Sequence, residues 1–199
     1  MTNVIITIGR EYGSGGREIG EKLAKELGFS FYDKDLLKIV AEKSGIQEQV
    51  LLKADETASN PLFAPYYPPS IDPGSLNDRV FKMQSDLIKE KADNENCVIV
   101  GRCANYVLED RENVVRVFIY ADMEKRINRV MTRHGIADRD VAVKLIKKID
   151  KQRRAYYQFY TEMKWGRNEG QDIMINSGLL GIDGTVAMLK AIVEQKMGK

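Results

Sequence analysis

The segment that most constrains the fold is the glycine-rich run Gly9–Glu18, which lies between a short apolar segment and an amphipathic one. The residues before it, Val4–Ile8, are largely β-branched, as is typical of a strand buried on both faces of a sheet. Apolar residues then recur at every fourth position from Ile19 to Leu27, and Gly28 follows, which predicts a helix that ends there. A strand, a glycine-rich turn and a helix in this order begin a βαβ unit of a parallel sheet.

Strand-like and helical patterns alternate along the rest of the chain. The further predicted strands cover residues 29–32, 97–100, 114–120 and 172–176. The further predicted helices begin near Asp33 or Asp35, at Ser75, near Met123, at Asp138 and near Asp183. This alternation predicts a single α/β domain over residues 1–199, with a five-stranded parallel sheet and helices on both faces. In such sheets ligands bind at the carboxyl ends of the strands.

All five prolines lie in one segment, Thr57–Gly74. Because proline fixes φ and has no backbone N–H, this segment is expected to be neither a helix nor a central strand. A loop of this length inside a compact domain is usually functional or mobile. We therefore expect this segment, and the residues around Arg133–Asp138, to be mobile without ligand and to close when one binds.

The glycine-rich run has the composition of a phosphate-binding turn. Its glycines allow backbone N–H groups to converge, and the start of the following helix adds partial positive charge. We predict that the phosphates of a nucleotide bind to Gly13, Ser14, Gly15, Gly16, Arg17 and Glu18. The alternative is an ordinary glycine-rich turn without a ligand.

The run departs from the pattern G-x-x-x-x-G-K-[ST] of the common phosphate-binding loop. Gly16 stands where the lysine would be, Arg17 follows it, and Glu18 stands near the usual hydroxyl. Lys22 lies more than a helical turn farther on, so its ammonium should point away from the mouth of the loop. We predict that Arg17 takes the place of the lysine, and that Mg²⁺ is bound by Ser14 or, through water, by a carboxylate.

The order of the segments resembles the cytidylate kinase-like branch of the nucleoside monophosphate kinases over nearly the whole chain. Five segments carry the resemblance: Ile6–Glu18, Tyr32–Leu36, Val98–Arg102, Val117–Arg126 and Asp150–Arg154. It implies a P-loop kinase-like fold, ATP and Mg²⁺ as cofactors, and two mobile parts: a helical acceptor-binding insertion over about residues 33–96 and a lid over about residues 133–155. Cys103 stands where cytidylate kinases carry an aspartate that helps to hold the pyrimidine nucleotide.

The chemistry of phosphoryl transfer favours many of the same side chains. Arginine stays charged and binds two phosphate oxygens at once, which suits the oxygens of a transferring phosphoryl group. We predict catalytic roles for Arg17, Arg102, Arg153 and Asp33, and acceptor binding by Tyr32, Asp33, Asp35, Gly101, Arg102, Arg126 and Arg154. Asp33 would receive the acceptor's proton or hold Mg²⁺ through water, and it is also placed to cap a helix. Arginines 126, 129 and 133 lie on one helix face. Instead of binding phosphate, they could form surface ion pairs with acidic residues.

Several other residues have simpler interpretations. His134, the single histidine, is expected on the surface. Trp165 and the tyrosines of the segment Tyr156–Tyr160 are expected in the core or in an interface. Asn176–Ser177 either approaches a nucleobase or forms a turn.

Charge and cysteine content narrow the functional classes. The chain has 31 Lys and Arg against 29 Asp and Glu, but residues 122–154 contain eleven basic and five acidic side chains. This basic segment favours an anionic ligand on one side, or a solvated helix face with ion pairs. It lacks interleaved exposed aromatics, which argues against nucleic acid as the partner. Cys97 and Cys103 match neither a zinc spacing nor a CxxC motif, and no apolar run approaches the length of a membrane span.

We therefore expect a cytoplasmic ATP-dependent phosphotransferase, monomeric or homodimeric, that acts on a nucleotide or another small phosphorylated or hydroxylated acceptor. Its expected partners exclude nucleic acid and membranes, and a signal peptide is not expected before the first strand. The alternative is a nucleotide-binding sensor or regulatory protein that has lost catalysis. The missing lysine favours that alternative, and the retained arginines favour the kinase.

Overall fold

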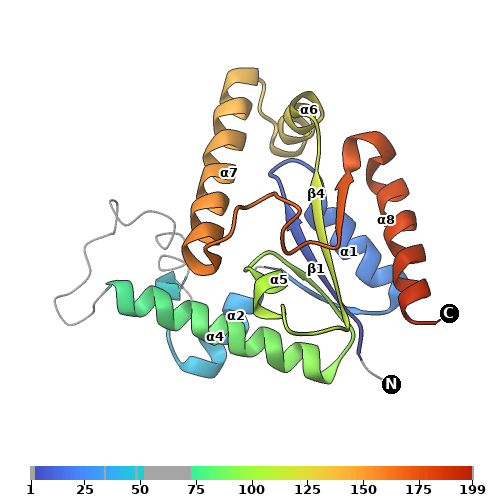
Figure 1. The fold of residues 1–199 in the computed structure, drawn as a ribbon. Helices are drawn as coiled ribbons and strands as arrows, with labels where there is room; N and C mark the ends of the chain where they lie inside the picture. Colours follow the sequence, from blue (N-terminus) through green and yellow to red (C-terminus); the bar gives the residue numbers. More distant parts are fainter. Residues whose placement is uncertain (1–2, 34, 48, 52–72, 199) are drawn as a thin grey trace.

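The computed structural model describes residues 3–33, 35–47, 49–51 and 73–198. Within these residues the chain forms one five-stranded sheet in the order β2-β3-β1-β4-β5, and all neighbouring strands are parallel. The strands are β1 (Ile5–Arg10), β2 (Ser30–Tyr32), β3 (Cys97–Val100), β4 (Val114–Tyr120) and β5 (Ile173–Asn176). The sheet confirms the predicted fold class, with β1 at its centre between β3 and β4 (Figure 1).

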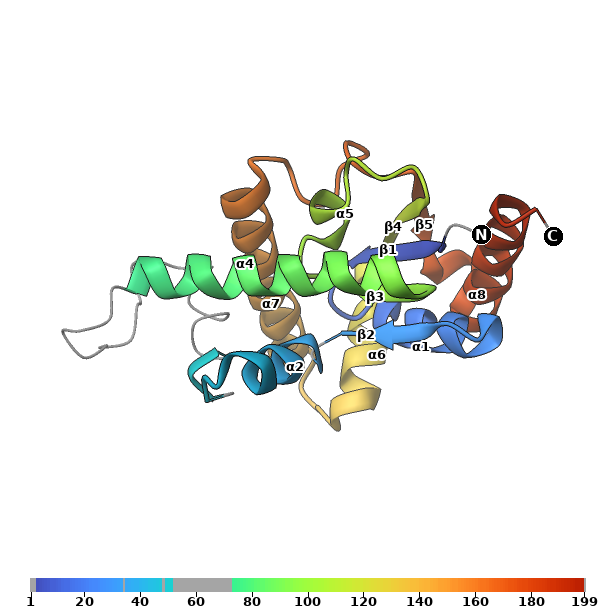
Figure 2. The same ribbon diagram turned by 90° about the horizontal axis from the view of Figure 1, so that it is seen from below.

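Helices cover both faces of the sheet (Figure 1, Figure 2). The described helices are α1 (Gly16–Leu27), α2 (Asp35–Ser44), α4 (Pro73–Asn94), α5 (Ala104–Val107), α6 (Met123–His134), α7 (Arg139–Thr161) and α8 (Ser177–Lys196). Successive side chains of a strand point to opposite faces. Accordingly, Ile6 and Ile8 of β1 pack with α1 and α8, whereas Ile5 packs with α2, α4 and α5. No helix among the described residues is both long and apolar enough to cross a membrane.

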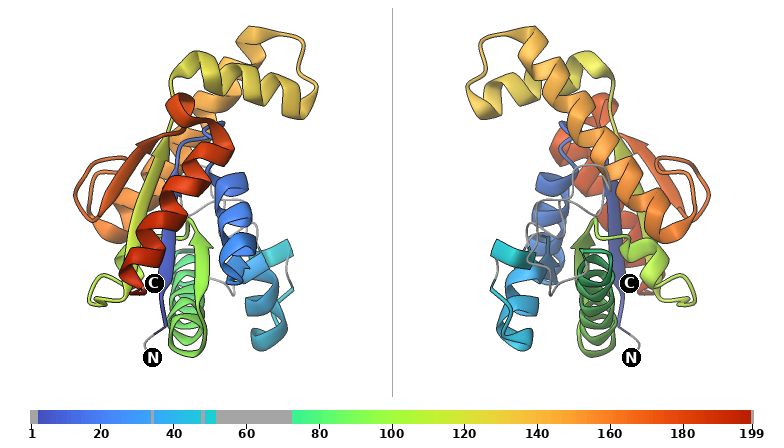
Figure 3. Two further views of the ribbon diagram at one scale, coloured as in Figure 1. Left: turned by 90° about the vertical axis from the view of Figure 1, so that its right-hand side faces the viewer. Right: turned by 90° about the vertical axis from the view of Figure 1, so that its left-hand side faces the viewer.

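Helices α6 and α7 form a hairpin that extends past the carboxyl ends of the strands (Figure 3). Ile127 of α6 and Ile146 of α7 belong to a small apolar cluster between the two helices. Gly135 ends α6 in the left-handed conformation, with φ 62°. Asp138 then caps α7, because its side chain accepts hydrogen bonds from two backbone amides of the first turn.

Two boundaries near the sheet differ from the sequence prediction. Strand β1 does not end at Gly9 but continues to Arg10, which pairs with Ile119 of β4. Helix α8 begins at Ser177, and Gly181 (φ 70°, ψ −176°) breaks it after one turn, so the helix predicted near Asp183 is its longer second part. Both differences lengthen regular structure around the glycine-rich loop.

The proline-rich segment is only partly within the described residues. Helix α4 begins at Pro73, two residues before the predicted start at Ser75, as suits a proline in a first helical turn. The rest of the predicted loop, residues 57–72, lies outside the described residues. Its predicted closure on a ligand stays a prediction.

Candidate functional site

The glycine-rich loop leads from the end of β1 into the start of α1 and is shaped for an anion. Gly13 and Gly15 adopt left-handed φ values of 81° and 84°, which glycine adopts without strain. Gly15 is the N-cap of α1, and no side chain of the described residues caps the first amides of that helix. Uncapped N–H groups at a helix start, with the helix dipole behind them, form a phosphate-binding arrangement.

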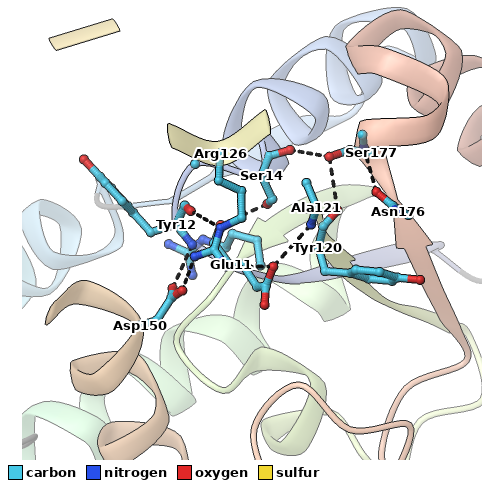
Figure 4. A network of polar contacts seen from close by, with 12 residues as sticks. Glu11, Tyr12, Ser14, Tyr120, Ala121, Arg126, Asp150, Asn176 and Ser177 are labelled. Carbon is cyan, nitrogen blue, oxygen red and sulfur yellow. Dashed lines mark hydrogen bonds and ion pairs between the residues drawn. The ribbon is translucent and has the colours of Figure 1, made fainter. Parts of the chain in front are cut away.

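Ser177, at the start of α8, anchors the loop through its side-chain hydroxyl. The Ser177 hydroxyl is buried and lies 2.5 Å from the carbonyl oxygen of Ser14 and 3.2 Å from that of Tyr120 (Figure 4). Ser14 is fully buried and donates its hydroxyl to the Glu11 carbonyl at 2.9 Å. Asn176 accepts a hydrogen bond from the Gly178 amide, so Asn176–Ser177 forms the turn and anchor of the loop. A metal-binding role for Ser14 stays a prediction.

Arg126 of α6 is the centre of a buried polar network at the front of the loop (Figure 4). Its guanidinium donates to the Tyr12 carbonyl at 2.8 Å, pairs with Glu11 at 3.1 Å and forms an ion pair with Asp150 of α7. Asp150 in turn accepts the Tyr12 amide at 2.8 Å. Burial raises the pKa of Glu11, while the Arg126 charge acts to lower it. The network joins the loop to both helices of the hairpin, and a direct contact of Arg126 with the acceptor stays a prediction.

Asp33 follows β2 and lies against two arginines. Its carboxylate is buried, accepts a hydrogen bond from Arg17 Nε at 2.8 Å, and lies 3.6 Å from Arg10 Nη2. Arg17 also contacts Glu21 at 3.3 Å, and its guanidinium lies over the Phe31 ring. Asp33 and Arg17, which were predicted as separate site residues, are therefore direct partners.

The other predicted residues near β2 contact neighbours outside the loop. The Tyr32 hydroxyl donates to Glu95 at 2.7 Å, and the exposed Asp35 pairs with Lys38 at 3.4 Å. Lys22 donates to Asp183 at 2.8 Å, on the side where α1 meets α8. The roles of Tyr32 and Asp35 in acceptor binding stay predictions.

The turn after β3 has a strained backbone. Gly101, Arg102 and Cys103 have consecutive left-handed φ values of 81°, 56° and 52°. For residues other than glycine this conformation costs roughly 1–2 kcal/mol each. Such strain persists only where the surrounding structure enforces it, and it is common at binding sites. The turn places Arg102 at the carboxyl end of the sheet, where the sequence predicted an acceptor-binding arginine.

A cavity of about 570 Å³ opens at the carboxyl ends of the central strands, between the strained turn, α7 and the segment around Trp165. It is lined by Thr7, Ile8, Gly9, Arg10, Tyr12, Gly101, Arg102, Cys103, Asn105, Phe118, Leu145, Lys148, Ile149, Gln152, Arg153, Tyr156, Tyr157, Trp165, Gly166 and Gln171. Four of these described residues are basic, and none carries a carboxylate. Among the lining residues, the buried Thr7 hydroxyl makes no hydrogen bond with any described residue. The cavity therefore has the charge to accept an anion.

Basic side chains crowd one another in this cavity. Arg153 donates to the Arg10 carbonyl at 3.0 Å, and its guanidinium lies over the Tyr12 ring. Burial lowers the pKa of Arg10, and the nearby positive charges of Arg153 and Arg102 lower it further. Burial also lowers the pKa of Arg153. Repulsion among buried cations is relieved when an anion binds between them.

Aromatic residues line the wall of the same cavity. Tyr156, Tyr157 and Trp165 were expected in the core or an interface; Tyr157 is buried as expected, and all three also border the cavity beside Arg153. The Arg154 guanidinium lies over the Trp165 ring at 5.8 Å. The spacing of the aromatic residues did not predict that they line a cavity. Such spacing identifies one face of a helix, but it does not show whether that face packs against the core or borders a cavity.

Three other residues of the site were missed in the sequence. Arg10, Glu11 and Asp150 are close to the glycine-rich loop, yet within the run only residues 13–18 were assigned a role. The available signal was the place of Arg10 at the carboxyl end of an apolar strand, since ligands bind at that end. His134 is exposed as expected, and its Nε2 lies 2.8 Å from the Tyr12 hydroxyl.

Comparison with known proteins agrees with this geometry. Residues 5–179 match the model of the cytidylate kinase-like family. The cytidylate kinase of Archaeoglobus fulgidus is 28% identical over 193 residues, which are 96% of this chain and 95% of that protein. The crystal structure of an uncharacterized protein from Eubacterium ventriosum is similar with a TM-score of 0.73 and 31% identity, over 96% of this chain and 99% of that one. Shikimate kinase from Bacteroides thetaiotaomicron shares the fold, with a TM-score of 0.55 and 16% identity over 96% and 98% of the two chains.

Proposed function

Because the chain belongs to the cytidylate kinase-like family, we propose that it is a phosphotransferase that moves the γ-phosphate of ATP to a nucleoside monophosphate or a related small anionic molecule. The observation that carries this proposal is the cavity beside the glycine-rich loop, where the described lining residues include Arg10, Arg102, Lys148 and Arg153 and no carboxylate. A donor phosphate at the start of α1 and an anionic acceptor in this cavity would be neighbours.

In this proposal the protein acts by positioning and charge neutralisation, which are the main requirements of phosphoryl transfer. The amides of the loop and of the first turn of α1 bind the donor phosphates. Arg102 and Arg153 hold the acceptor and the transferring group with two-pronged hydrogen bonds. Asp33 accepts the proton of a hydroxyl acceptor, or binds a water of the metal ion.

Mg²⁺ would enter with ATP and offset the charge of the phosphate oxygens. Magnesium in kinases is held by one or two protein oxygens together with substrate phosphates. The Asp33 carboxylate fits this donor set, since its buried Oδ1 accepts no hydrogen bond from a described residue, and Ser14 adds a hydroxyl oxygen. We propose these two residues as the protein's contribution to the metal site.

We further propose that residues 33–96 bind the acceptor and that residues 133–155 act as a lid within a single domain. The α6–α7 hairpin supports the second part, because Asp150 of α7 contacts the loop directly. Closure of such a hairpin would exclude water from the transferring phosphoryl group.

CMP is only one of the acceptors to test. Cys103 is buried and borders the cavity, so the carboxylate that cytidylate kinases carry at this place is missing. The decisive experiment is a turnover assay with ATP and Mg²⁺ against a panel of nucleoside monophosphates and small phosphorylated or hydroxylated metabolites. We expect ADP formation that depends on one class of anionic acceptor. Tight ATP binding without turnover on any acceptor would instead favour the sensor.

A further inference from the structure

We infer that Arg10 supplies the positive charge that the lysine of other phosphate-binding loops brings to the donor phosphates. Its side chain occupies the space that a lysine at position 16 would need. This inference rests on the proposed phosphotransferase function, and it identifies the residue that would compensate for the missing lysine.

The first observation is the contact between Arg10 and Gly16. A Cβ atom on Gly16 would lie 2.5 Å from Arg10 Cβ and 3.1 Å from Arg10 Cγ. Gly16 does not have a positive φ, so the backbone conformation does not require glycine here. What requires glycine is the stem of Arg10, which cannot move aside because its Cβ is fixed to strand β1. The presence of Arg10 thus explains the absence of the lysine.

The second observation is the position of the Arg10 guanidinium. From Gly16 the side chain extends over Gly101, where a Cβ atom would clash with Arg10 Nη1. The charged group thereby lies between the glycine-rich loop and the strained turn after β3. It also borders the basic cavity, so it is within reach of both a donor and an acceptor phosphate.

The third observation is that the Arg10 guanidinium keeps donors for a ligand. Among the described residues it makes one ion pair, with Asp33 at 3.6 Å, and donates no hydrogen bond. A guanidinium has five N–H donors, and phosphate oxygens are suitable acceptors for them. Its side chain is only 19% exposed, and charge interactions are stronger at a buried position than in water.

Three other basic side chains near the loop already donate hydrogen bonds to protein groups. Arg17 is 43% exposed and donates to both Asp33 and Glu21. Lys22 donates to Asp183. Arg129 donates to the Gly13 carbonyl at 2.8 Å, which holds the loop itself. Arg10 is therefore the side chain whose position and free donors both suit the role.

The test measures the affinity for MgATP and MgADP by calorimetry, together with the rate of ADP formation, in matched variants. We expect Arg10→Ala to bind MgATP at least about 10-fold more weakly and to lose about 10²–10³ in rate. Arg10→Lys should retain part of both. The control Lys25→Ala, which removes an exposed cation from the last turn of α1, should behave as the wild type. Arg17→Ala should lose less than Arg10→Ala.

A second set of variants moves the positive side chain from position 10 to position 16, where the common phosphate-binding loop has its lysine. Gly16→Lys alone should melt at a lower temperature, because its Cβ meets the Arg10 stem. The double variant Arg10→Gly/Gly16→Lys should be more stable than Gly16→Lys. It should also bind MgATP more tightly than Arg10→Gly. Circular dichroism of each variant shows whether it is folded. If Gly16→Lys is as stable as the wild type, the inference that Arg10 occupies the space needed by a lysine at position 16 is wrong.

The outcomes separate this inference from the proposed function. If the wild type fails to bind MgATP, the proposed function is wrong. If the wild type binds MgATP while Arg10→Ala binds and turns over equally well, the inference is wrong and the proposed function stands. If Arg17→Ala loses more affinity for MgATP than Arg10→Ala, the lysine's role belongs to Arg17.

Discussion

Arg126 and Asp150 form a buried ion pair that also engages both backbone polar groups of Tyr12. Arg126 donates to the Tyr12 carbonyl at 2.8 Å, and Asp150 accepts the Tyr12 amide at 2.8 Å. A residue of the glycine-rich loop is thus held simultaneously by α6 and α7. The conformation of the loop and the packing of the hairpin are parts of one network.

Removing one partner of this pair should be strongly destabilising. Arg126→Ala would leave the buried Asp150 and the partly buried Glu11 without their cation, and we expect a loss of about 3–5 kcal/mol in the free energy of unfolding, measured with urea. The control is Arg139→Ala, which breaks an exposed ion pair with Glu124 and should cost less than about 1 kcal/mol. Equal effects of the two variants would contradict the structural role of Arg126.

Ser177→Ala should weaken both the fold and phosphate binding. The change removes the hydroxyl that contacts the buried carbonyls of Ser14 and Tyr120, at a cost of about 1–3 kcal/mol. Because Ser14 is in the loop, the affinity for MgATP should fall as well. Ser85→Ala is a matched control, since its hydroxyl donates only to a carbonyl one turn back in α4. A Ser177→Ala protein with wild-type stability would rule out the anchor.

Arg102→Gly should be more stable than Arg102→Ala by about 1 kcal/mol, because position 102 has a left-handed φ of 56°. The order should be reversed at Lys147, an exposed position inside α7, where glycine is less favourable than alanine. Thermal or urea unfolding of the four variants checks the prediction. If alanine is the more stable at both positions, the turn after β3 is not strained.

The buried thiol of Cys97 should make the free energy of unfolding fall as the pH rises above neutral. Burial raises the pKa of the Cys97 thiol to about 12, so the folded thiol keeps its proton where the unfolded one loses it. Since the folded pKa is raised, the contribution is complete below the unfolded pKa and declines above it, by about 1.4 kcal/mol per pH unit up to the folded pKa. The difference in unfolding free energy between the wild type and Cys97→Ala should therefore shrink from pH 8 to pH 10.5. A constant difference over this range would contradict the burial of the thiol.

Much of the fold was predictable from local patterns. The alternation of β-branched runs and helical periodicity is a property of neighbouring residues, and it identified all five strands of the described sheet. The strand–loop–helix geometry of the glycine-rich run was similarly local, since it depends on glycines between a strand and a helix start. The ends of elements were less predictable, as the continuation of β1 to Arg10 and the early start of α8 at Ser177 illustrate.

The sequence by itself determined the fold class, the site of the glycine-rich loop and the gathering of basic residues between 122 and 154. Only the tertiary structure decided what each of those side chains meets. Arg126 and Lys147 belong to the same basic segment, yet the first is buried against Asp150 and the second is exposed. The contact of Arg10 with Gly101 likewise depends on β3 lying beside β1. Periodicity identifies the face of a helix or strand, but the partner of that face is set by long-range packing, which no window of neighbouring residues contains.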